Sequence, residues 1–316
     1  MRRHSSGTAP AALVLLAAAF AFRAFAQGSG DFTYSTNTRL VVLPVTVLDK
    51  NGHLVTDLTQ GQFQVFDNNQ PEALKVFKRE DVPVSMGIII DSSGSMRDKR
   101  AKVQSAAITL VKDSNKEDEV FIVNFNDEAF LDMDFTSDIK KMEQGLSKID
   151  SRGGTAMRDA LRMSIDHLKE KGKRDKRVLL VVTDGDDNAS MVSLENLTRE
   201  AQSSDVLIYA IGLLSEDEKR EAKRAKRALV TLTEATGGMA FFPKEVSDVE
   251  QIAHEVAKDI RNQYTLGYTP PGSDGAYHTV KVTVNAPGKL NVRTRLGYYA
   301  TPEGMSTPHG PTSATK

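Results

Sequence analysis

Five oxygen-bearing side chains lie in three short segments that each adjoin a predicted strand or helix. Asp91, Ser93 and Ser95 follow an aliphatic run at every second position in "MGIIIDSSGSMRDKR". Thr155 lies in the glycine-hinged loop "SRGGTAM", and Asp184 ends the aliphatic run of "RVLLVVTDGDDN". The i, i+2, i+4 spacing aims the first three side chains to one side of an extended segment. Oxygen donors without histidine or cysteine suit hard cations, namely Mg²⁺, Mn²⁺ or Ca²⁺.

Alternating strands and helices must position these loops. From residue 84 to residue 263, short aliphatic runs alternate with helical patterns, such as the stripe of Val103, Ala106, Ala107 and Leu110. This alternation predicts a Rossmann-like, doubly wound α/β fold, in which helices cover both faces of a mostly parallel sheet. Ligands bind such sheets beyond the carboxyl ends of the strands, where the strand order reverses. We therefore expect the three loops to meet at one edge of the sheet.

The three motifs resemble the metal-ion-dependent adhesion site (MIDAS) of von Willebrand factor type A domains. "DSSGSM" matches the D-x-S-x-S element, "GGTAM" the threonine loop and "TDGDDN" the T-D-G element. The likeness covers about residues 84–263, and the flanks resemble a bacterial secreted group in which a "LGYY"-type strand ends the domain. The resemblance implies five metal ligands, with Mg²⁺ expected first and Mn²⁺ or Ca²⁺ as alternatives: Asp91, Ser93, Ser95, Thr155 and Asp184.

The implied function is cation-dependent binding of a partner protein in adhesion or assembly. If both aspartates bind mostly through water, the ion stays electron-poor and has an open position for an Asp or Glu carboxylate of the partner. In relatives with this motif the last helix shifts when ligand binds. The segment "VEQIAHEVAKDIRNQ" is therefore a candidate relay to the β segment that follows.

Other interpretations of the same residues are weaker. Serine caps at a strand-to-helix turn would explain "DSSGSM" alone, and a phosphate cradle lacks the G-K-[ST] element. A serine nucleophile would need G-x-S-x-G and a partner histidine, so we expect no catalytic residue and no enzyme. A metal-dependent hydrolase and a structural envelope protein with a fold-stabilising metal stay as alternatives. Asp186 and Asp187 could join the outer shell of the metal or favour Ca²⁺, but solvated side chains are the preferred interpretation.

The composition and the N-terminus indicate where the protein acts. The 316 residues carry a formal net charge of -1 and no cysteine, so nothing indicates nucleic acid, a disulfide or a thiolate metal site. Two arginines, an apolar run and Ala24-Phe25-Ala26 predict a secretory signal cleaved near Ala26–Gln27. Arg23 is untypical there, so an uncleaved N-terminal anchor is an alternative. We expect a secreted or periplasmic protein without a stable membrane span in the mature chain.

Alternating apolar residues on both sides of the α/β segment predict antiparallel strands. Val41, Leu43, Val45 and Val47 alternate with other residues, and Pro44 among them predicts an edge strand. Together the two flanks predict a small β-sandwich that the α/β domain interrupts. The expected organisation is a signal peptide at 1–26, a β segment at 31–82, the von Willebrand factor type A domain at 83–263, a second β segment at 264–300 and a disordered tail at 301–316.

Overall fold

Six strands form the central sheet of the α/β part in the computed structural model, which describes residues 40–79, 81–147, 152–215 and 219–301. Their order is β10-β9-β8-β5-β6-β7, and their bounds are β5 (Val84–Asp91), β6 (Glu119–Phe125), β7 (Ala129–Thr136), β8 (Lys176–Thr183), β9 (Val206–Gly212) and β10 (Ala240–Phe241). All neighbours are parallel except β6 and the edge strand β7. Since β6 and β8 lie on opposite sides of β5, the strand order reverses at β5.

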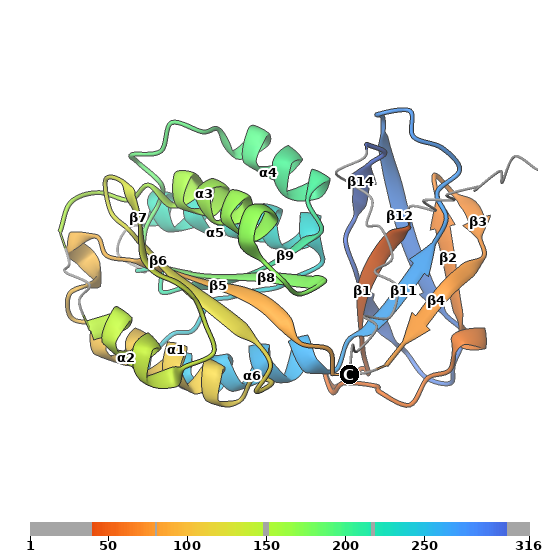
Figure 1. Cartoon of the computed structure of the whole chain (residues 1–316), viewed down its shortest axis with the longest axis horizontal. Coiled ribbons are helices and arrows are strands. Elements are labelled where there is room, and N and C mark those ends of the chain that lie inside the picture. The colour runs from red at the N-terminus through yellow and green to blue at the C-terminus, as the bar shows by residue number, and fades with distance from the viewer. Residues whose placement is uncertain (1–39, 80, 148–151, 216–218, 302–316) are drawn as a thin grey trace, which may run out of the picture. The chain divides into compact units, whose positions relative to one another are not determined.

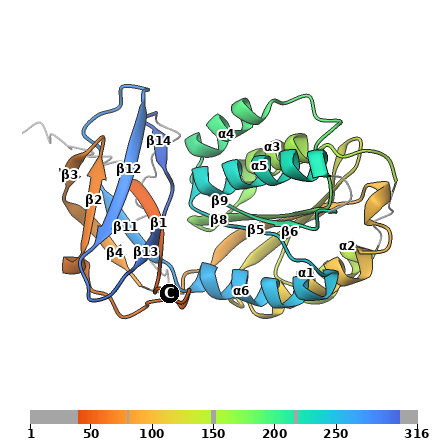
Figure 2. The same cartoon turned by 180° about the vertical axis from the view of Figure 1, so that it is seen from behind.

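Helices cover both faces of this sheet (Figures 1 and 2). One face carries α1 (Arg100–Lys112), α2 (Ile139–Ser147) and α6 (Val249–Arg261). The other carries α3 (Met157–Lys171), α4 (Leu194–Ser203) and α5 (Lys219–Thr236). The Rossmann-like α/β prediction is therefore confirmed.

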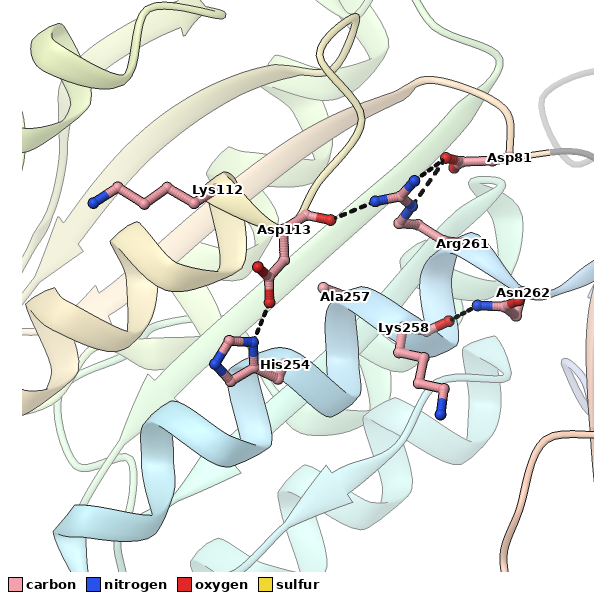
Figure 3. A pocket seen from close by; sticks show the side chains of 8 residues that line it. All are labelled: Asp81, Lys112, Asp113, His254, Ala257, Lys258, Arg261 and Asn262. Atoms are coloured by element: carbon pink, nitrogen blue, oxygen red, sulfur yellow. Dashed lines mark hydrogen bonds and ion pairs between the residues drawn. The ribbon is translucent and has the colours of Figure 1, made fainter.

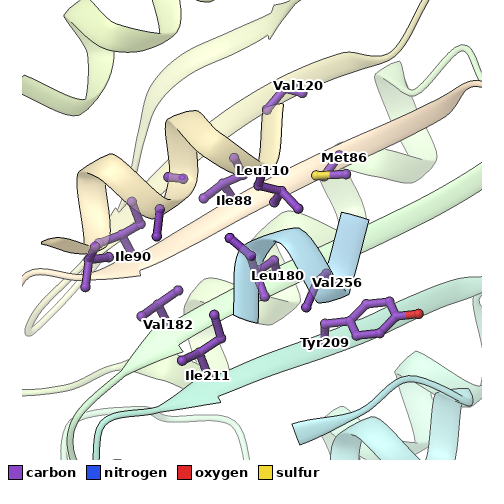
Figure 4. Packing of buried hydrophobic residues seen from close by; sticks show 14 of the residues in the cluster. Met86, Ile88, Ile90, Leu110, Val120, Leu180, Val182, Tyr209, Ile211 and Val256 are labelled. Carbon is purple, nitrogen blue, oxygen red and sulfur yellow. The ribbon is translucent and has the colours of Figure 1, made fainter. Parts of the chain in front are cut away.

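Side chains of each strand alternate between two hydrophobic cores, as the period of a β-strand requires. Ile88 and Ile90 of β5 pack in the core below α1 and α6, together with Leu110 (Figure 4). Ile89, between them, lies in the core on the α3 side. The predicted stripe on α1 is buried at all four positions.

Gly87 allows the sheet and its neighbours to pack closely in the middle of β5. A Cβ atom at this residue would lie 2.4 Å from Cζ of Phe121 and 2.6 Å from a methyl carbon of Leu179. Glycine avoids both clashes because it has no side chain.

The flanking segments form two antiparallel four-stranded sheets. Their orders are β13-β1-β11-β4 and β14-β12-β2-β3, with bounds β1 (Val41–Leu48), β2 (Phe63–Asp67), β3 (Gln70–Glu72), β4 (Leu74–Lys78), β11 (Tyr264–Tyr268), β12 (Tyr277–Val284), β13 (Asn291–Arg293) and β14 (Gly297–Tyr299). Residues of both sheets share one hydrophobic core, in which the ring of Phe63 in β2 packs on that of Tyr264 in β11. Each sheet combines strands from before and after the α/β part.

The prediction that Pro44 marks an edge strand is wrong, because β1 lies between β11 and β13. Strand β11 pairs with residues 41–45 of β1, whereas β13 pairs only with residues 46–48. Among the described strands, Pro44 therefore pairs on one side only, with Thr265 of β11. Proline has no N–H group to donate, and it is tolerated where one side of a strand is unpaired.

A buried polar network joins the last helix of the α/β part to the flanking strands. Asp259 of α6 is 8% exposed and accepts hydrogen bonds from Tyr209 of β9 at 2.7 Å and Thr46 of β1 at 2.8 Å. It also pairs with the guanidinium of Arg293 in β13. Burial, followed by the nearby charge of Asp259, raises the pKa of Tyr209 well above its ordinary value. The hydroxyl therefore stays protonated and keeps donating.

Two predicted segments lie largely outside the described residues, namely the signal peptide at 1–26 and the tail at 301–316. Within the part of the chain that is described, no helix is both long and apolar enough to span a bilayer.

Candidate metal centre

Two of the three predicted loops are joined by main-chain hydrogen bonds at the carboxyl edge of the sheet. Asp91 is the last residue of β5, and the chain continues through Ser93 into the short 3-10 helix η2 (Gly94–Met96). The amide of Arg152 donates to the carbonyl of Ser92 at 2.8 Å, and the amide of Gly94 donates to that of Gly153 at 3.3 Å. The threonine loop thus lies directly against the serine loop.

Asp91 is held by donors from its own loop and from the neighbouring strand. Its side chain accepts the amide of Ser93 at 2.8 Å and the hydroxyl of Thr183, at the end of β8, at 2.6 Å. The residue is 2% exposed. Burial raises the pKa of the Asp91 carboxyl to about 6, while the hydrogen bonds from Thr183 and Ser93 oppose this and the charge of Asp184 adds to it. A cation in front of this carboxylate would favour its charged form.

Side chains join the serine loop to Asp184. The hydroxyls of Ser93 and Ser95 lie 3.1 Å apart, and Ser95 donates to Oδ1 of Asp184 at 2.8 Å. The ammonium of Lys99 contacts Oδ2 of the same carboxylate at 2.5 Å. The side chain of Asp184 is 1% exposed, whereas that of Lys99 is 26% exposed. Both oxygens of Asp184 therefore have internal partners.

Thr155 is positioned by the loop that follows Asp184. Its amide donates to Oδ1 of Asn188 at 2.9 Å, and the amide of Asn188 donates back to the carbonyl of Thr155 at 3.1 Å. A Cβ atom at Gly185 would lie 3.8 Å from the Thr155 hydroxyl, so this hydroxyl faces the residue next to Asp184. All three loops that carry the predicted residues are thus in mutual contact.

The sequence interpretation missed Asp127, which supports the threonine loop. Its carboxylate accepts the amide of Gly154 at 2.8 Å. Gly153 has a φ of +77°, and a Cβ atom there would lie 2.2 Å from the Asp127 carboxylate. The available signal was "FIVNFND", an aliphatic run that ends in polar residues as the run before Asp91 does. Lys99 was also missed, since its contact with Asp184 spans 85 positions.

The preferred interpretation of Asp186 and Asp187 as solvated side chains is wrong. Asp186 accepts from Arg224 of α5 at 2.6 Å. Asp187 accepts from the amide of Arg158 at 2.8 Å and from its guanidinium at 3.0 Å, and its side chain is 6% exposed. It also accepts from the amide and hydroxyl of Ser190. These bonds fix the loop after Asp184 against α3 and α5.

The donor chemistry of this edge fits a hard divalent cation. It combines two carboxylates with three hydroxyls, all of them oxygen ligands. In the described ranges, no group of three or more histidine, cysteine, aspartate or glutamate residues is arranged to hold a metal. Two carboxylates would balance the charge of one divalent ion, and the hydroxyls could ligate it without adding charge.

A separate open hollow of about 650 Å³ lies at the other end of α1, against α6 (Figure 3). Four of its lining residues are joined by contacts: Arg261 contacts Asp81 at 2.7 Å and the carbonyl of Asp113 at 2.7 Å, and His254 contacts the Asp113 carboxylate. The hollow is lined by Asp81, Lys112, Asp113, His254, Ala257, Lys258, Arg261 and Asn262. None of the five predicted ligands is among them.

Three solved structures illustrate the proteins that this chain is similar to. A von Willebrand factor type A protein from Catenulispora acidiphila is 14% identical with a TM-score of 0.49, and the match covers 84% of this chain and 75% of that chain. The PilB minor pilin from Streptococcus sanguinis is 12% identical with a TM-score of 0.47, and the match covers 58% and 63%. Proximal thread matrix protein 1 from the mussel byssus, with a zinc-occupied MIDAS motif, is 17% identical with a TM-score of 0.48, and the match covers 60% and 48%. The chain thus spans less than two thirds of the pilin and of the mussel protein.

Sequence comparison gives a more direct assignment. No curated protein has significant similarity to the chain. Residues 86–186 match the family model described as von Willebrand factor type A domain. This range is about a third of the chain, and it includes most of β5, all of β6 and β8, and all five predicted ligands. The chain therefore contains a von Willebrand factor type A domain.

Proposed function

We propose that this chain binds a partner protein through a divalent cation at the carboxyl edge of the sheet. Mg²⁺ is the first expectation, and Mn²⁺ or Ca²⁺ are alternatives. The residues that would hold the ion are Asp91, Ser93, Ser95, Thr155 and Asp184. The observation that carries the proposal is the 2.8 Å contact between Ser95 and Asp184, which joins loops 89 positions apart. The bound ion would offer an electrophilic position for a carboxylate oxygen of the partner.

A binding role is favoured over hydrolysis by the position of the general bases. Each of the four described histidines contacts a carboxylate away from this edge: His53 contacts Asp49, His167 Asp134, His254 Asp113 and His278 Asp67. Each oxygen of Asp91 already accepts a hydrogen bond, one from the Ser93 amide and one from the Thr183 hydroxyl. A hydrolase would need a base within reach of a bound water.

Exposed charges near the site are of both signs. Arg97 is exposed in the segment after Ser95 and Arg152 on the threonine loop, but Asp98 and Asp127 are exposed as well. The chemistry expected of the partner therefore follows from the cation, which an Asp or Glu carboxylate oxygen would ligate.

The metal part of the proposal is tested by isothermal titration calorimetry with Mg²⁺, Mn²⁺ and Ca²⁺. Ser93→Ala should weaken binding by about 10-fold or more, because it removes one oxygen ligand. Ser203→Ala is the matched control, since that hydroxyl donates to the carbonyl of Arg199 within α4. Equal affinities in both variants and the wild type would contradict the assignment.

The partner part is tested by selecting peptides on the immobilised protein in Mn²⁺ and eluting with EDTA. Selected peptides should contain Asp or Glu, and replacing that residue by Asn or Gln should abolish binding. Capture that persists in EDTA, together with a melting temperature that rises with metal, would favour a structural metal instead. Metal-dependent turnover of phosphate or carboxyl esters that disappears in Asp91→Ala would favour a hydrolase.

The site of action proposed from the N-terminus is outside the cytoplasm. Mass spectrometry of the native protein should find a mature start at Gln27. A start at Met1 in the membrane fraction would favour the uncleaved anchor.

A further inference from the structure

Lys99 supplies a positive charge inside the candidate metal centre. Its ammonium contacts Oδ2 of Asp184 at 2.5 Å, and the Ser95 hydroxyl contacts Oδ1 at 2.8 Å. The carboxylate is buried, with 1% of its side chain exposed, so an ammonium partner is what keeps its charge compensated. Lys99 thus compensates the negative charge of Asp184, as a bound metal ion also would.

The position of this lysine is unfavourable for the helix that it begins. Lys99 is the N-cap residue of α1, its side chain makes no capping hydrogen bond, and the first turn contains no acidic residue. Cations at a helix N-terminus are disfavoured by the helix dipole, and lysine is not among the good N-cap residues. The contact with Asp184 offsets this local cost, so the lysine is explained by the site and not by the helix.

We propose that Lys99 is an internal cation that competes with the divalent metal for Asp184 and so sets the metal affinity of the site. This inference rests on the proposed function. A metal placed against Oδ2 of Asp184 would compete with the ammonium, because that oxygen already accepts from Lys99 and two positive charges would repel each other there. Lysine has a flexible four-carbon stem, and about a quarter of this side chain is exposed, so the ammonium has a route to solvent.

The competition has two consequences for binding. The apparent dissociation constant is the intrinsic one divided by the fraction of molecules in which Lys99 has left Asp184. Moreover, the metal-free protein keeps a compensated buried carboxylate, so its loops need no metal to hold their positions. The site therefore fills only at metal concentrations above this raised apparent dissociation constant.

Calorimetric titration with Mn²⁺ of the full chain tests the inference with three proteins. Lys99→Met keeps the apolar stem and removes the ammonium, and it should bind Mn²⁺ about 5- to 30-fold more tightly than the wild type. Lys102→Met is the matched control, because it removes the charge of an exposed lysine from the same helix. The Mn²⁺ affinity of Lys102→Met should stay within about 2-fold of the wild type if the direct contact of Lys99 with Asp184 matters and the long-range effect of a nearby positive charge does not.

Thermal melting gives a second readout. In EDTA, Lys99→Met should melt at a lower temperature than the wild type, because the buried Asp184 carboxylate keeps the Ser95 hydroxyl but loses the only ion-pair partner that it has among the described residues. Saturating Mn²⁺ should raise its melting temperature by more than that of the wild type. If Lys99→Met does not fold without metal, Lys99→Gln takes its place, since its amide still donates to Asp184 without a charge.

The outcomes separate this inference from the proposed function. Equal Mn²⁺ affinity in the wild type and Lys99→Met, or an equal gain in Lys102→Met, overturns the role of Lys99 and leaves the metal site intact. If Lys99→Met binds Mn²⁺ and neither the wild type nor Lys102→Met does, Lys99 competes strongly enough to keep the metal out. No binding of Mn²⁺, Mg²⁺ or Ca²⁺ by any variant refutes the metal site and both proposals with it.

Discussion

Asp259 offers the sharpest test of how the α/β part and the flanking strands depend on each other. Asp259→Ala would leave the guanidinium of Arg293 and the hydroxyls of Tyr209 and Thr46 without their shared acceptor. The side chains of Asp259 and Arg293 are 11% and 19% exposed, so the pair is largely but not fully removed from water. The substitution should therefore act on stability and leave the candidate metal centre in place.

The magnitude follows from the burial of the pair. Removing one partner of a buried ion pair costs about 3–5 kcal/mol, and the residual exposure of Arg293 favours the lower end, about 3 kcal/mol. For a chain longer than about 250 residues each kcal/mol lowers the melting temperature by about 2 °C, so the expected decrease is about 6 °C.

Guanidinium chloride unfolding and calorimetric melting provide the assay. Glu255→Ala is the control, because Glu255 is exposed on the same helix, and it should change the free energy of unfolding by less than about 0.5 kcal/mol. A double-mutant cycle with Arg293→Met should give a coupling energy of about 1–3 kcal/mol. A loss below about 1 kcal/mol in Asp259→Ala, or strict additivity in the cycle, would refute the reasoning.

Three further predictions concern single residues. Burial lowers the pKa of Lys176 from its ordinary 10.5 to about 8, so the unfolded chain binds more protons between these values and the free energy of unfolding should rise with pH there. We expect a rise of about 1–3 kcal/mol from pH 8 to pH 10 in denaturant titrations, which Lys176→Met should abolish while leaving the protein more stable than the wild type at pH 7. Asp127→Ala removes the acceptor for Gly154 and should weaken Mn²⁺ binding in calorimetry by about 3- to 10-fold with an unchanged circular dichroism spectrum. An unchanged affinity would show that the threonine loop holds its position without Asp127. Gly87→Ala places a methyl group 2.4 Å from Phe121 and should destabilise the protein by about 1–3 kcal/mol in chemical unfolding, and a neutral result would mean that the ring moves aside easily.

The sheet and the meeting point of the loops were predictable because they depend on local patterns. Aliphatic runs that end in Asp91 and Asp184 mark the carboxyl ends of parallel strands, and the periodic stripe on α1 marks its buried face. Strands that share a parallel sheet bring those ends to one edge whatever the intervening sequence is.

The partners of charged residues were not predictable in the same way. Asp187 was expected in solvent, yet Arg158 and Ser190 bind it, because the helix that follows the threonine loop passes beside it. In the local sequence Lys99 is one more basic residue at the start of a predicted helix. Its contact with Asp184 depends on how close two distant loops come in the fold. The prediction from Pro44 was wrong for a related reason. The pairing of β13 with β1 ends before Pro44, and sequence does not show where a partner strand stops.

The two junctions of the α/β part lie close together, and this has a consequence for the order of folding. Asp81 before β5 pairs with Arg261 at the end of α6, and next to them Lys78 of β4 pairs with Thr265 of β11. Roughly 190 residues separate the paired strands, so β1 and β4 precede β11 by most of the α/β part along the chain. Until that part has brought its two ends together, β1 and β4 have no β11 between them. Once the α/β part has folded, it brings the two strands within reach and removes most of the entropy cost of closing the long loop. We therefore expect the two flanking sheets to form only after the α/β part has folded.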